Sequence, residues 1–358
     1  MTIRDIARLS GCSVATVSRV LNRYPDVSEA TRRRVMSVVE AYQFQPNSNA
    51  PRQRVLAVVE ERGFRPNSNA RHLKQQAGRR VSVIVKGTQN MLFAEMVEQV
   101  QLRVQDRGLD TAVYYVDEDA NEVAFALQVC REYKPPAILF LGGDLEYFRR
   151  DFAPIGVPCV LLTNSARELG FANLSSVSTD DAAAAERATD YLFLHHHRKI
   201  GVLGGNWAGS QISYQRFLGC RRSFEKHGVP FDGAGQCEPC RYAFSDAYAA
   251  TGRLLDRNPE LTAIFALSDV MAIGAIRALR DRGYRVPEDI SVMGFDGVPV
   301  GEYAVPRLAT VRQDIRLMAE RGADILLERM ERRLPPVYET APFHLILGES
   351  VAPRREWG

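Results

Sequence analysis

Residues 2–22, TIRDIARLSGCSVATVSRVLN, restrict the fold of this chain more than any other stretch. Thr2 and Asp5 form a capping-box pattern at the start of a helix whose apolar residues recur at helical spacing. Gly11 offers the backbone freedom that a sharp turn requires, and Ser13 is a suitable cap for a second helix. The stretch therefore predicts two short helices joined by a tight turn, the helix-turn-helix geometry.

The polar face of the second helix indicates a nucleic-acid partner. Hydroxyl, guanidinium and amide groups can bond phosphates and base edges, although on a helix surface they are often only solvated. The string SVATVSRVLN followed by VSEATRRRV resembles the start of the lactose/galactose repressor (LacI/GalR) family over more than thirty residues. The resemblance implies binding of double-stranded operator DNA through Thr2, Ser13, Val14, Ala15, Thr16, Ser18, Arg19 and Asn22. Arg19 is the best candidate for bonding guanine, and Val14 and Ala15 can offer only apolar contact.

Length, charge and cysteines limit the class of protein. A chain of 358 residues predicts two or three domains. Residues 1–80 carry a net charge of +9 and the remainder −6, which is typical of a nucleic-acid-binding module on an acidic body. No secretory signal or membrane span is recognisable, so we expect a cytoplasmic protein without a membrane partner. The pair Cys237 and Cys240 has no second ligand pair nearby, so we expect reduced thiols, no metal site and no cofactor.

A tandem duplication follows the predicted head. A third helix is expected from Ser28 to about Gln43, with three arginines in its first turns. Residues 31–50 and 51–70 are identical at 12 of 20 positions, whereas the family pattern has one copy. We assign residues 1–50 to the DNA-binding head and residues 51–78 to the duplicated helix and a hinge helix. The alternative is that the second copy packs on the head and the first is looped out.

The hinge assignment depends on which copy continues the family pattern. In the family, the segment after P-N-x-x-A-R folds on DNA into a short helix whose leucine enters the minor groove and wedges a base step apart. The second copy continues with Asn69, Arg71 and Leu73, whereas Pro51 interrupts the first. The resemblance therefore implies a hinge at residues 67–75, with Leu73 as the wedge.

From residue 81 onward, short apolar runs alternate with amphipathic stretches. Strands are expected at residues 81–85, 111–116, 137–141, 159–162, 200–203, 263–267 and 290–295. Helices are expected at residues 93–107, 120–133, 181–194, 214–227, 246–256 and 269–282. This alternation predicts an α/β body of two doubly wound lobes with parallel sheets, so the chain combines an all-α head with an α/β effector domain. Ligand loops should lie at the carboxyl ends of the strands.

The body also resembles the periplasmic-binding-protein-like effector domain of the same family. AIFALSDVMA, VPEDISVMGFD and RLATVRQ carry the closest likeness. The resemblance implies three chain crossings, near residues 177–180, 308–312 and 337–341. It predicts an effector-binding and dimerisation domain at residues 79–350, with lobe 1 at about 79–178 and 310–338 and lobe 2 at about 179–309 and 339–350.

A cleft between two lobes can sequester a small polar molecule when polar groups converge from both sides. The residues that the resemblance places there are Asn90, Phe93, Asn164, Trp207, Arg216, Asp269 and Asp296. Three of these have an alternative role. Asp269 would cap a helix in any case, Arg216 could form an ion pair within one lobe, and Trp207 could be buried packing. Lys86-Gly87 stands where the family usually has Pro-Asp, so one expected sugar-binding carboxylate is missing.

These features predict a homodimeric transcriptional regulator, most simply a repressor, controlled by a small polar effector such as a sugar. The effector, the operator, the sign of its control and the choice between dimer and tetramer stay open. A solute-binding protein of the transport type is the alternative, but the basic head argues against it. The sequence contains neither G-x-S-x-G nor G-x-x-x-x-G-K-[ST], so we do not expect an enzyme.

Overall fold

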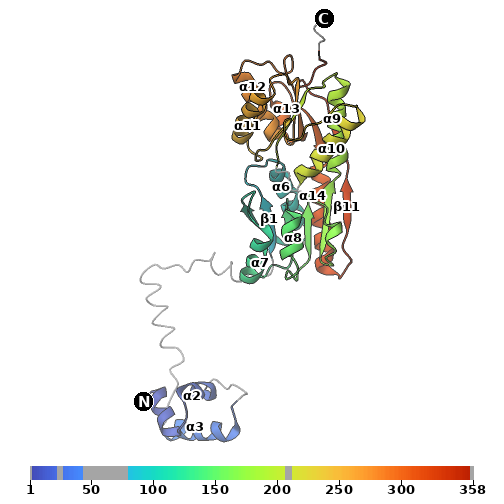
Figure 1. Cartoon of the computed structure of the whole chain (residues 1–358). Coiled ribbons are helices and arrows are strands. Elements are labelled where there is room, and N and C mark those ends of the chain that lie inside the picture. Colours follow the sequence, from blue (N-terminus) through green and yellow to red (C-terminus); the bar gives the residue numbers. More distant parts are fainter. Residues whose placement is uncertain (1, 22–26, 43–79, 206–211, 355–358) are drawn as a thin grey trace. The chain divides into compact units, whose positions relative to one another are not determined.

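The computed structural model describes residues 2–21, 27–42, 80–205 and 212–354 (Figure 1). They fall into two compact units, a head within residues 2–42 and a body within residues 80–354, and each is described by itself. Several predictions lie outside the described residues: those for Asn22, Asn69, Arg71, Leu73, Trp207 and the segment 51–78.

The head contains three helices: α1 (Ile3–Ser10), α2 (Val14–Leu21) and α3 (Glu29–Ala41). The predicted capping box is confirmed, because Asp5 N donates to Thr2 Oγ1 and Thr2 N donates to Asp5 Oδ2 over 2.8 Å. Gly11 adopts the left-handed conformation with φ of 62°, which ends α1 and turns the chain. Ser13 Oγ accepts the amide of Thr16 and caps α2. Local sequence signals thus set both ends of the turn.

A small apolar core holds the three helices together. Its buried members come from every helix: Ile6, Ala7, Val17, Val20, Val35 and Val39. Val17 lies on the inner face of α2 and is fully buried. A core of this size gives the head only a small free energy of unfolding, because small domains bury a small fraction of their surface.

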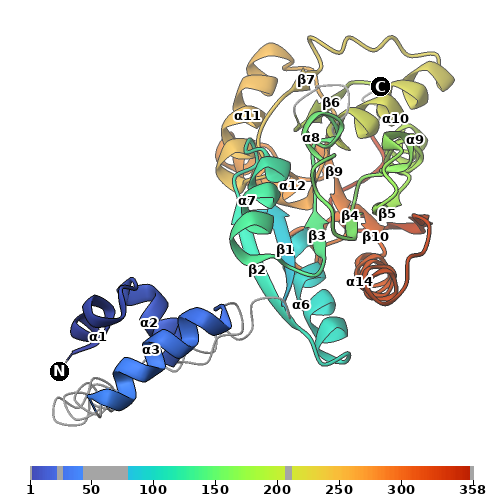
Figure 2. The same cartoon turned by 90° about the horizontal axis from the view of Figure 1, so that it is seen from below.

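Lobe 1 of the body is a six-stranded parallel sheet covered by helices on both faces (Figures 1 and 2). Its strands are β1 (Arg80–Lys86), β2 (Asp110–Val116), β3 (Ile138–Leu141), β4 (Cys159–Leu162), β5 (Leu174–Thr179) and β11 (Tyr338–Ala341), in the order β11-β5-β4-β3-β1-β2. Its helices are α6 (Leu92–Gln105), α7 (Glu122–Tyr133), α8 (Leu145–Asp151), the 3₁₀ turn η1 (Arg167–Leu169) and α14 (Ile315–Glu331). Alternate residues of β1 face opposite layers, since Val83 packs with α6 and α14 while Ile84 packs with α7 and α8.

Lobe 2 repeats this architecture with a second six-stranded sheet. Its strands are β6 (Ile200–Leu203), β7 (Cys237–Glu238), β8 (Ala263–Ala266), β9 (Ser291–Asp296), β10 (Ala309–Gln313) and β12 (Phe343–Ile346), in the order β12-β10-β9-β8-β6-β7. Only β12, paired with β10, runs antiparallel to its neighbour among these strands. Its helices are α9 (Asp181–Leu194), α10 (Ile212–Lys226), α11 (Phe244–Arg257), α12 (Asp269–Asp281) and the short α13 (Val300–Tyr303). Helix α9 packs with α10, and α11 packs with α12.

The chain passes between the lobes three times. The first crossing follows β5 at Asp180, the second follows β10 at Asp314, and the third lies at Pro342 between β11 and β12. The second and third crossings lie a few residues later than predicted, so residues 314–341, rather than 310–338, return to lobe 1. The sequence could not place them, because β10 and β11 are short strands and β11 in particular shows no continuous apolar run.

Three consecutive histidines, residues 195–197, follow α9, and the third of them is buried. His196 adopts φ of 62°, the left-handed conformation that favours glycine. His197 is buried, with Nδ1 3.1 Å from Thr262 Oγ1 and Nε2 3.0 Å from the Ala352 carbonyl oxygen. Because a carbonyl only accepts, Nε2 carries the proton of the neutral ring and Nδ1 is the unprotonated nitrogen. Burial lowers the pKa of His197 from 6.5 to about 4.

Acid should therefore destabilise the body through His197. The unfolded state binds a proton at this residue below about pH 6.5 and the folded state only below about pH 4, so this contribution is present above pH 6.5 and lost as the pH falls toward 4. The expected loss is about 3 kcal/mol. Urea unfolding at pH 7 and pH 4.5 should show a smaller difference in His197→Asn than in the wild type. Equal pH dependence in the two proteins would contradict the prediction.

Candidate DNA-binding head and interlobe cleft

Helix α2 presents a compact set of contact groups on the outer surface of the head. Val14, Ala15 and Arg19 are exposed along it, and 43% of Val14 is accessible. At its start the hydroxyls of Ser13 and Thr16 lie 2.8 Å apart. The buried face of the same helix holds Val17 and Val20, so the core fixes which residues point outward.

Two further parts of the head carry polar groups suited to phosphates. Thr2, at the first turn of α1, is exposed. On α3, Arg33 and Arg34 are exposed, and Arg34 Nη2 lies 3.4 Å from Cys12 Sγ. Ser18, by contrast, is half-buried on α2. Basic and hydroxyl groups at helix starts are the usual anchors for a nucleic-acid backbone.

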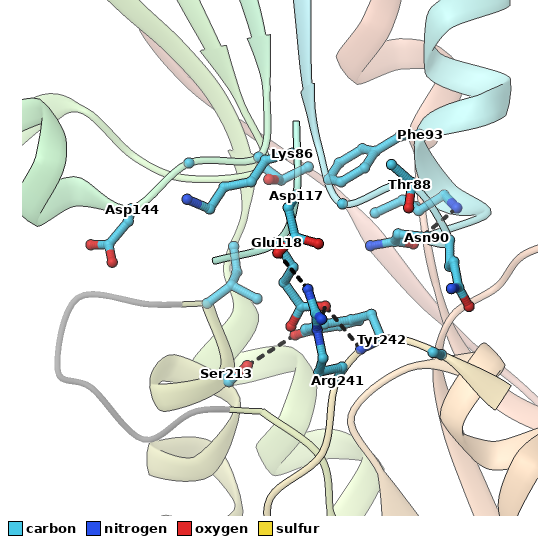
Figure 3. Close-up of a pocket in the computed structure, with 18 of the residues that line it drawn as sticks. Lys86, Thr88, Asn90, Phe93, Asp117, Glu118, Asp144, Ser213, Arg241 and Tyr242 are labelled. Atoms are coloured by element: carbon cyan, nitrogen blue, oxygen red, sulfur yellow. Dashed lines mark hydrogen bonds and ion pairs between the residues drawn. The ribbon is translucent and has the colours of Figure 1, made fainter. Parts of the chain in front are cut away.

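The body contains a cleft between its lobes, with a cavity of about 200 Å³ (Figure 3). Lobe 1 supplies the loops that follow β1, β2, β3 and β4, and lobe 2 supplies the start of α10 and the segment between β7 and α11. The lobe 1 groups thus lie at the carboxyl ends of parallel strands, where α/β folds place ligands. The predicted position of the site, between the lobes, agrees with this geometry.

Lys86, at the end of β1, brings a cation to the cleft wall. Its Nζ lies 2.5 Å from Glu122 Oε2 and 2.5 Å from the Ala120 carbonyl oxygen, and 4.9 Å from the centre of the Tyr147 ring. Glu122 is fully buried, and its other oxygen accepts the amide of Asp144 over 2.6 Å. Burial raises the pKa of Glu122, while the Lys86 ammonium opposes that shift. The lysine therefore neutralises a buried carboxylate, and that carboxylate ties the loop after β3 to α7.

Arg216, on α10, is the centre of a buried ion cluster in lobe 2. Its Nε donates to Asp181 Oδ1 over 2.7 Å, its Nη2 lies 3.2 Å from Asp296 Oδ1, and its Nη1 donates to the Leu267 carbonyl oxygen. The guanidinium also lies 3.8 Å from the centre of the Phe295 ring. Burial acts against its charge, but the two carboxylates outweigh burial and raise its pKa. Arg216 thus both lines the cleft and forms the intralobe ion pair that the sequence left as an alternative.

The two other predicted carboxylates lie behind the cleft wall. Asp296 is buried at the end of β9 with φ of 109°, and it accepts from Gln313 Nε2 over 2.8 Å. Burial raises its pKa to about 6, with Arg216 opposing. Asp269 is fully buried at the start of α12, where it accepts from Thr310 Oγ1 and from the Val298 amide. Neither residue is among those that line the cavity.

Of the predicted lobe 1 residues, two line the cavity and one supports a loop of its wall. Asn90 and Phe93 line the cavity, and Asn90 Oδ1 accepts the Leu92 amide at the start of α6. Asn164 is buried and donates to the Gly143 carbonyl oxygen over 2.7 Å, so it supports the loop after β3. Its neighbour Thr163, with φ of 79°, does line the cavity.

Sequence reasoning missed several polar lining residues. Those residues are Asp117, Glu118, Asp144, Ser213, Arg241, Tyr242 and Asp246. Asp117, Glu118 and Asp144 follow β2 and β3, so their place after strand-like runs was a usable signal. Arg241 and Tyr242 follow the two-residue strand β7, which leaves no periodic trace.

The cysteines of the chain are free thiols. Burial raises the pKa of Cys240 to about 12 and raises that of Cys237 further. Across the described ranges, no three His, Cys, Asp or Glu side chains are grouped as a metal site would require. Over the same ranges, no helix is both long and apolar enough to cross a membrane.

Comparisons with known proteins agree with both units. The family model "Bacterial regulatory proteins, lacI family" matches residues 2–47, and that of the "Periplasmic binding protein-like domain" matches residues 189–351. The chain is 33% identical over 334 residues to the HTH-type transcriptional regulator MalR of Clostridium butyricum, which covers 91% of this chain and 92% of the relative. It is 30% identical to the HTH-type transcriptional regulator GalS of Salmonella typhimurium, over 92% and 89% of the two chains.

A solved structure supports the fold of the whole chain. The structure described as a transcriptional regulator CelR–cellobiose complex superposes with a TM-score of 0.66 at 26% identity, covering 98% of this chain and 99% of that one. A helix-turn-helix head followed by a two-lobed α/β body defines the class, a DNA-binding transcriptional regulator. Within that class, the chain belongs to the lacI family of bacterial regulatory proteins.

Proposed function

We propose that this regulator is a repressor whose operator affinity is controlled by a small, polar, hydroxyl-rich metabolite bound in the interlobe cleft. The observation that carries the proposal is the presence, in one chain, of the exposed α2 surface and a cleft lined from both lobes by charged and polar groups. A transport-type solute-binding protein is disfavoured, because the family match includes the DNA-binding head. A protein that binds an operator acts where the DNA lies, so the proposal implies a cytoplasmic location.

The head would read the major groove through α2. Arg19 can bond guanine with two parallel hydrogen bonds, and Val14 and Ala15 can contact thymine methyl groups. Thr2, Ser13, Thr16, Ser18 and Asn22 would position the helix through the backbone or adjacent base edges. Selection of duplexes from a random pool by the full chain tests this proposal. A chain shortened by its first eighty residues should select no sequence, and equal selection by both proteins would refute it.

The hinge segment would contact the minor groove. Asn69 and Arg71 would follow the backbone, and Leu73 would insert between two base pairs at the centre of the site. Leu73→Ala should therefore abolish the bend in the selected operator while the heads still bind it, because the apolar wedge that unstacks the step is gone. Gel mobility of circularly permuted operator fragments measures the bend. An unchanged bend would show that another residue is the wedge.

Two copies of the chain would read a pseudo-palindromic site. One head presents one recognition helix, so a two-fold operator needs two heads whose spacing the body maintains. We therefore infer a homodimer as the DNA-binding unit. Light scattering of the purified full chain, alone and on the selected duplex, checks this. A monomer on a single half-site would contradict it.

The cleft residues indicate the class of effector. Lys86 and Arg241 can donate, Asp117, Asp144 and Asp246 can accept, and hydroxyl pairs of a sugar do both. Phe93 offers a flat apolar wall for a ring face. Similar proteins carry such ligands, since the structures that resemble this chain include one described with cellobiose and one with bound ribose. A thermal-shift screen of neutral and amino sugars should show a concentration-dependent rise in Tm for the true effector.

An effector can control the operator only through its different affinities for two conformations of the body. If lobe closure separates the two heads, the effector is an inducer. If closure aligns them, it is a corepressor. Titrating operator binding against the effector found in the screen decides between these signs.

A further inference from the structure

The two sheets of the body are linked at one edge and meet again at the other. All three chain crossings leave from β5, β10, β11 or β12, and these strands form one edge of each sheet. The opposite edge strands are β2 in lobe 1 and β7 in lobe 2. A contact beyond β2 and β7 therefore lies farthest from the crossings, where a rotation of one lobe produces the largest displacement.

Such a contact is present. Arg241 Nη2, after β7, donates to Asp117 Oδ1 over 2.6 Å (Figure 3). It also lies 3.5 Å from Asp119 Oδ2, and both carboxylates follow β2. Arg241 Nε lies 3.8 Å from Glu118 Oε2, and the backbone amide of Tyr242 donates to the same oxygen over 3.2 Å. We call these five residues the clasp. Four of the five also line the cavity, and Asp119 does not.

Electrostatics and anchoring both support the clasp as an interlobe link. Three carboxylates face one guanidinium, and the hydrogen bond to Asp117 raises the pKa of Arg241. On the lobe 2 side, the Tyr242 hydroxyl lies 3.0 Å from Ser213 Oγ at the start of α10, so the clasp is fixed to its own lobe. Arg241 retains 45% exposure, and exposed ion pairs are individually weak. Its effect on lobe closure comes from its position beyond β2 and β7, far from the crossings, and from the several bonds that the clasp makes together.

We propose that the clasp is a conformational latch that sets how readily the two lobes close over the cleft. It joins the lobes through protein atoms alone, so it favours closure whether or not an effector is bound. Its consequence for regulation rests on the proposed function: a latch that stabilises the closed body lets the effector use less of its binding energy for closure. Weakening the latch would then lower effector affinity without removing any buried group.

Hydrogen exchange of the full chain tests the latch without DNA or effector. The Tyr242 amide is bonded across the cleft, so its exchange rate reports the clasp directly. Arg241→Met keeps the apolar stem and removes the guanidinium. We expect about fivefold faster exchange at Tyr242 and faster exchange in residues 87–91 on the opposite wall. Arg241→Lys, which keeps a cation, should restore most of the protection.

Arg285→Met is the matched control, because Arg285 pairs with Asp289 within lobe 2 on an exposed surface. It should leave exchange at both cleft walls unchanged. Wild-type exchange in Arg241→Met would overturn the latch, and so would a change confined to Tyr242 or an equal change in Arg285→Met. Failure of the proposed function would instead appear in the duplex selection, which does not involve Arg241.

Discussion

Arg216→Met is expected to lower the free energy of unfolding of the body by about 3–5 kcal/mol. The substitution leaves Asp181 and Asp296 buried without their cation, together with the Leu267 carbonyl oxygen that Arg216 satisfies. Methionine fills much of the same space, so the loss reflects uncompensated charge rather than a cavity. Urea unfolding followed by circular dichroism measures it.

Two further variants separate charge from packing. Arg222→Met removes an exposed arginine from the same helix and should change stability little. The triple variant Arg216→Met, Asp181→Asn, Asp296→Asn carries no unpaired charge at the cluster and should recover a substantial part of the loss. If the triple variant is no more stable than Arg216→Met, the ion cluster does not explain the effect.

The strands and helices of the body were predictable where burial leaves a continuous or periodic apolar pattern. Residues 159–162, 200–203 and 181–194 were predicted with the bounds that the structure has. The predicted strand at 81–85 is one residue shorter than β1 at each end, and the predicted helix at 269–282 is one residue longer than α12 at its end. Central strands of a parallel sheet are buried on both faces, so their sequences are apolar throughout.

The elements that the sequence did not reveal owe their structure to tertiary contacts. Four of the six residues of strand β5, LSSVST, are serine or threonine, yet the strand is buried because Ser175 and Ser176 bond neighbouring segments. Strand β7 consists of two residues and, among the described strands, pairs with β6 alone. Residue 348 is a glycine because the chain passes close to β10 there: a Cβ at this position would lie 2.4 Å from the Ala309 nitrogen. Such constraints are visible only in three dimensions.

For the cleft, the family resemblance named residues of which some line the cavity and others do not. Asn90, Phe93 and Arg216 line the cavity, whereas Asp269 and Asp296 are bonded internally behind it. A motif identifies which residues lie near a site, but it cannot show which oxygens neighbouring groups already occupy. The effector roles of these residues therefore stay predictions.

Val17→Asn should abolish operator binding while leaving the body folded. Val17 is fully buried in a core of six side chains drawn from three short helices. The substitution removes apolar burial and buries an amide among apolar side chains that offer it no hydrogen bond. Together these effects cost about 3–5 kcal/mol. A head this small has no more than about that much stability, so it should be largely unfolded. Apparent affinity falls with the folded fraction, and we expect a loss of at least about a hundredfold.

The comparison that isolates the core is Leu9→Asn, which places the same side chain on an exposed position of α1 with 43% of the leucine accessible. It should retain the fold of the head, because no packed contact or buried amide is created. Binding of the selected duplex by gel shift, with the unfolding of the body followed in parallel, separates the two units. Near-normal affinity in Val17→Asn would mean that operator DNA recognises this protein without the packed three-helix head, which would remove the physical basis for assigning recognition to α2.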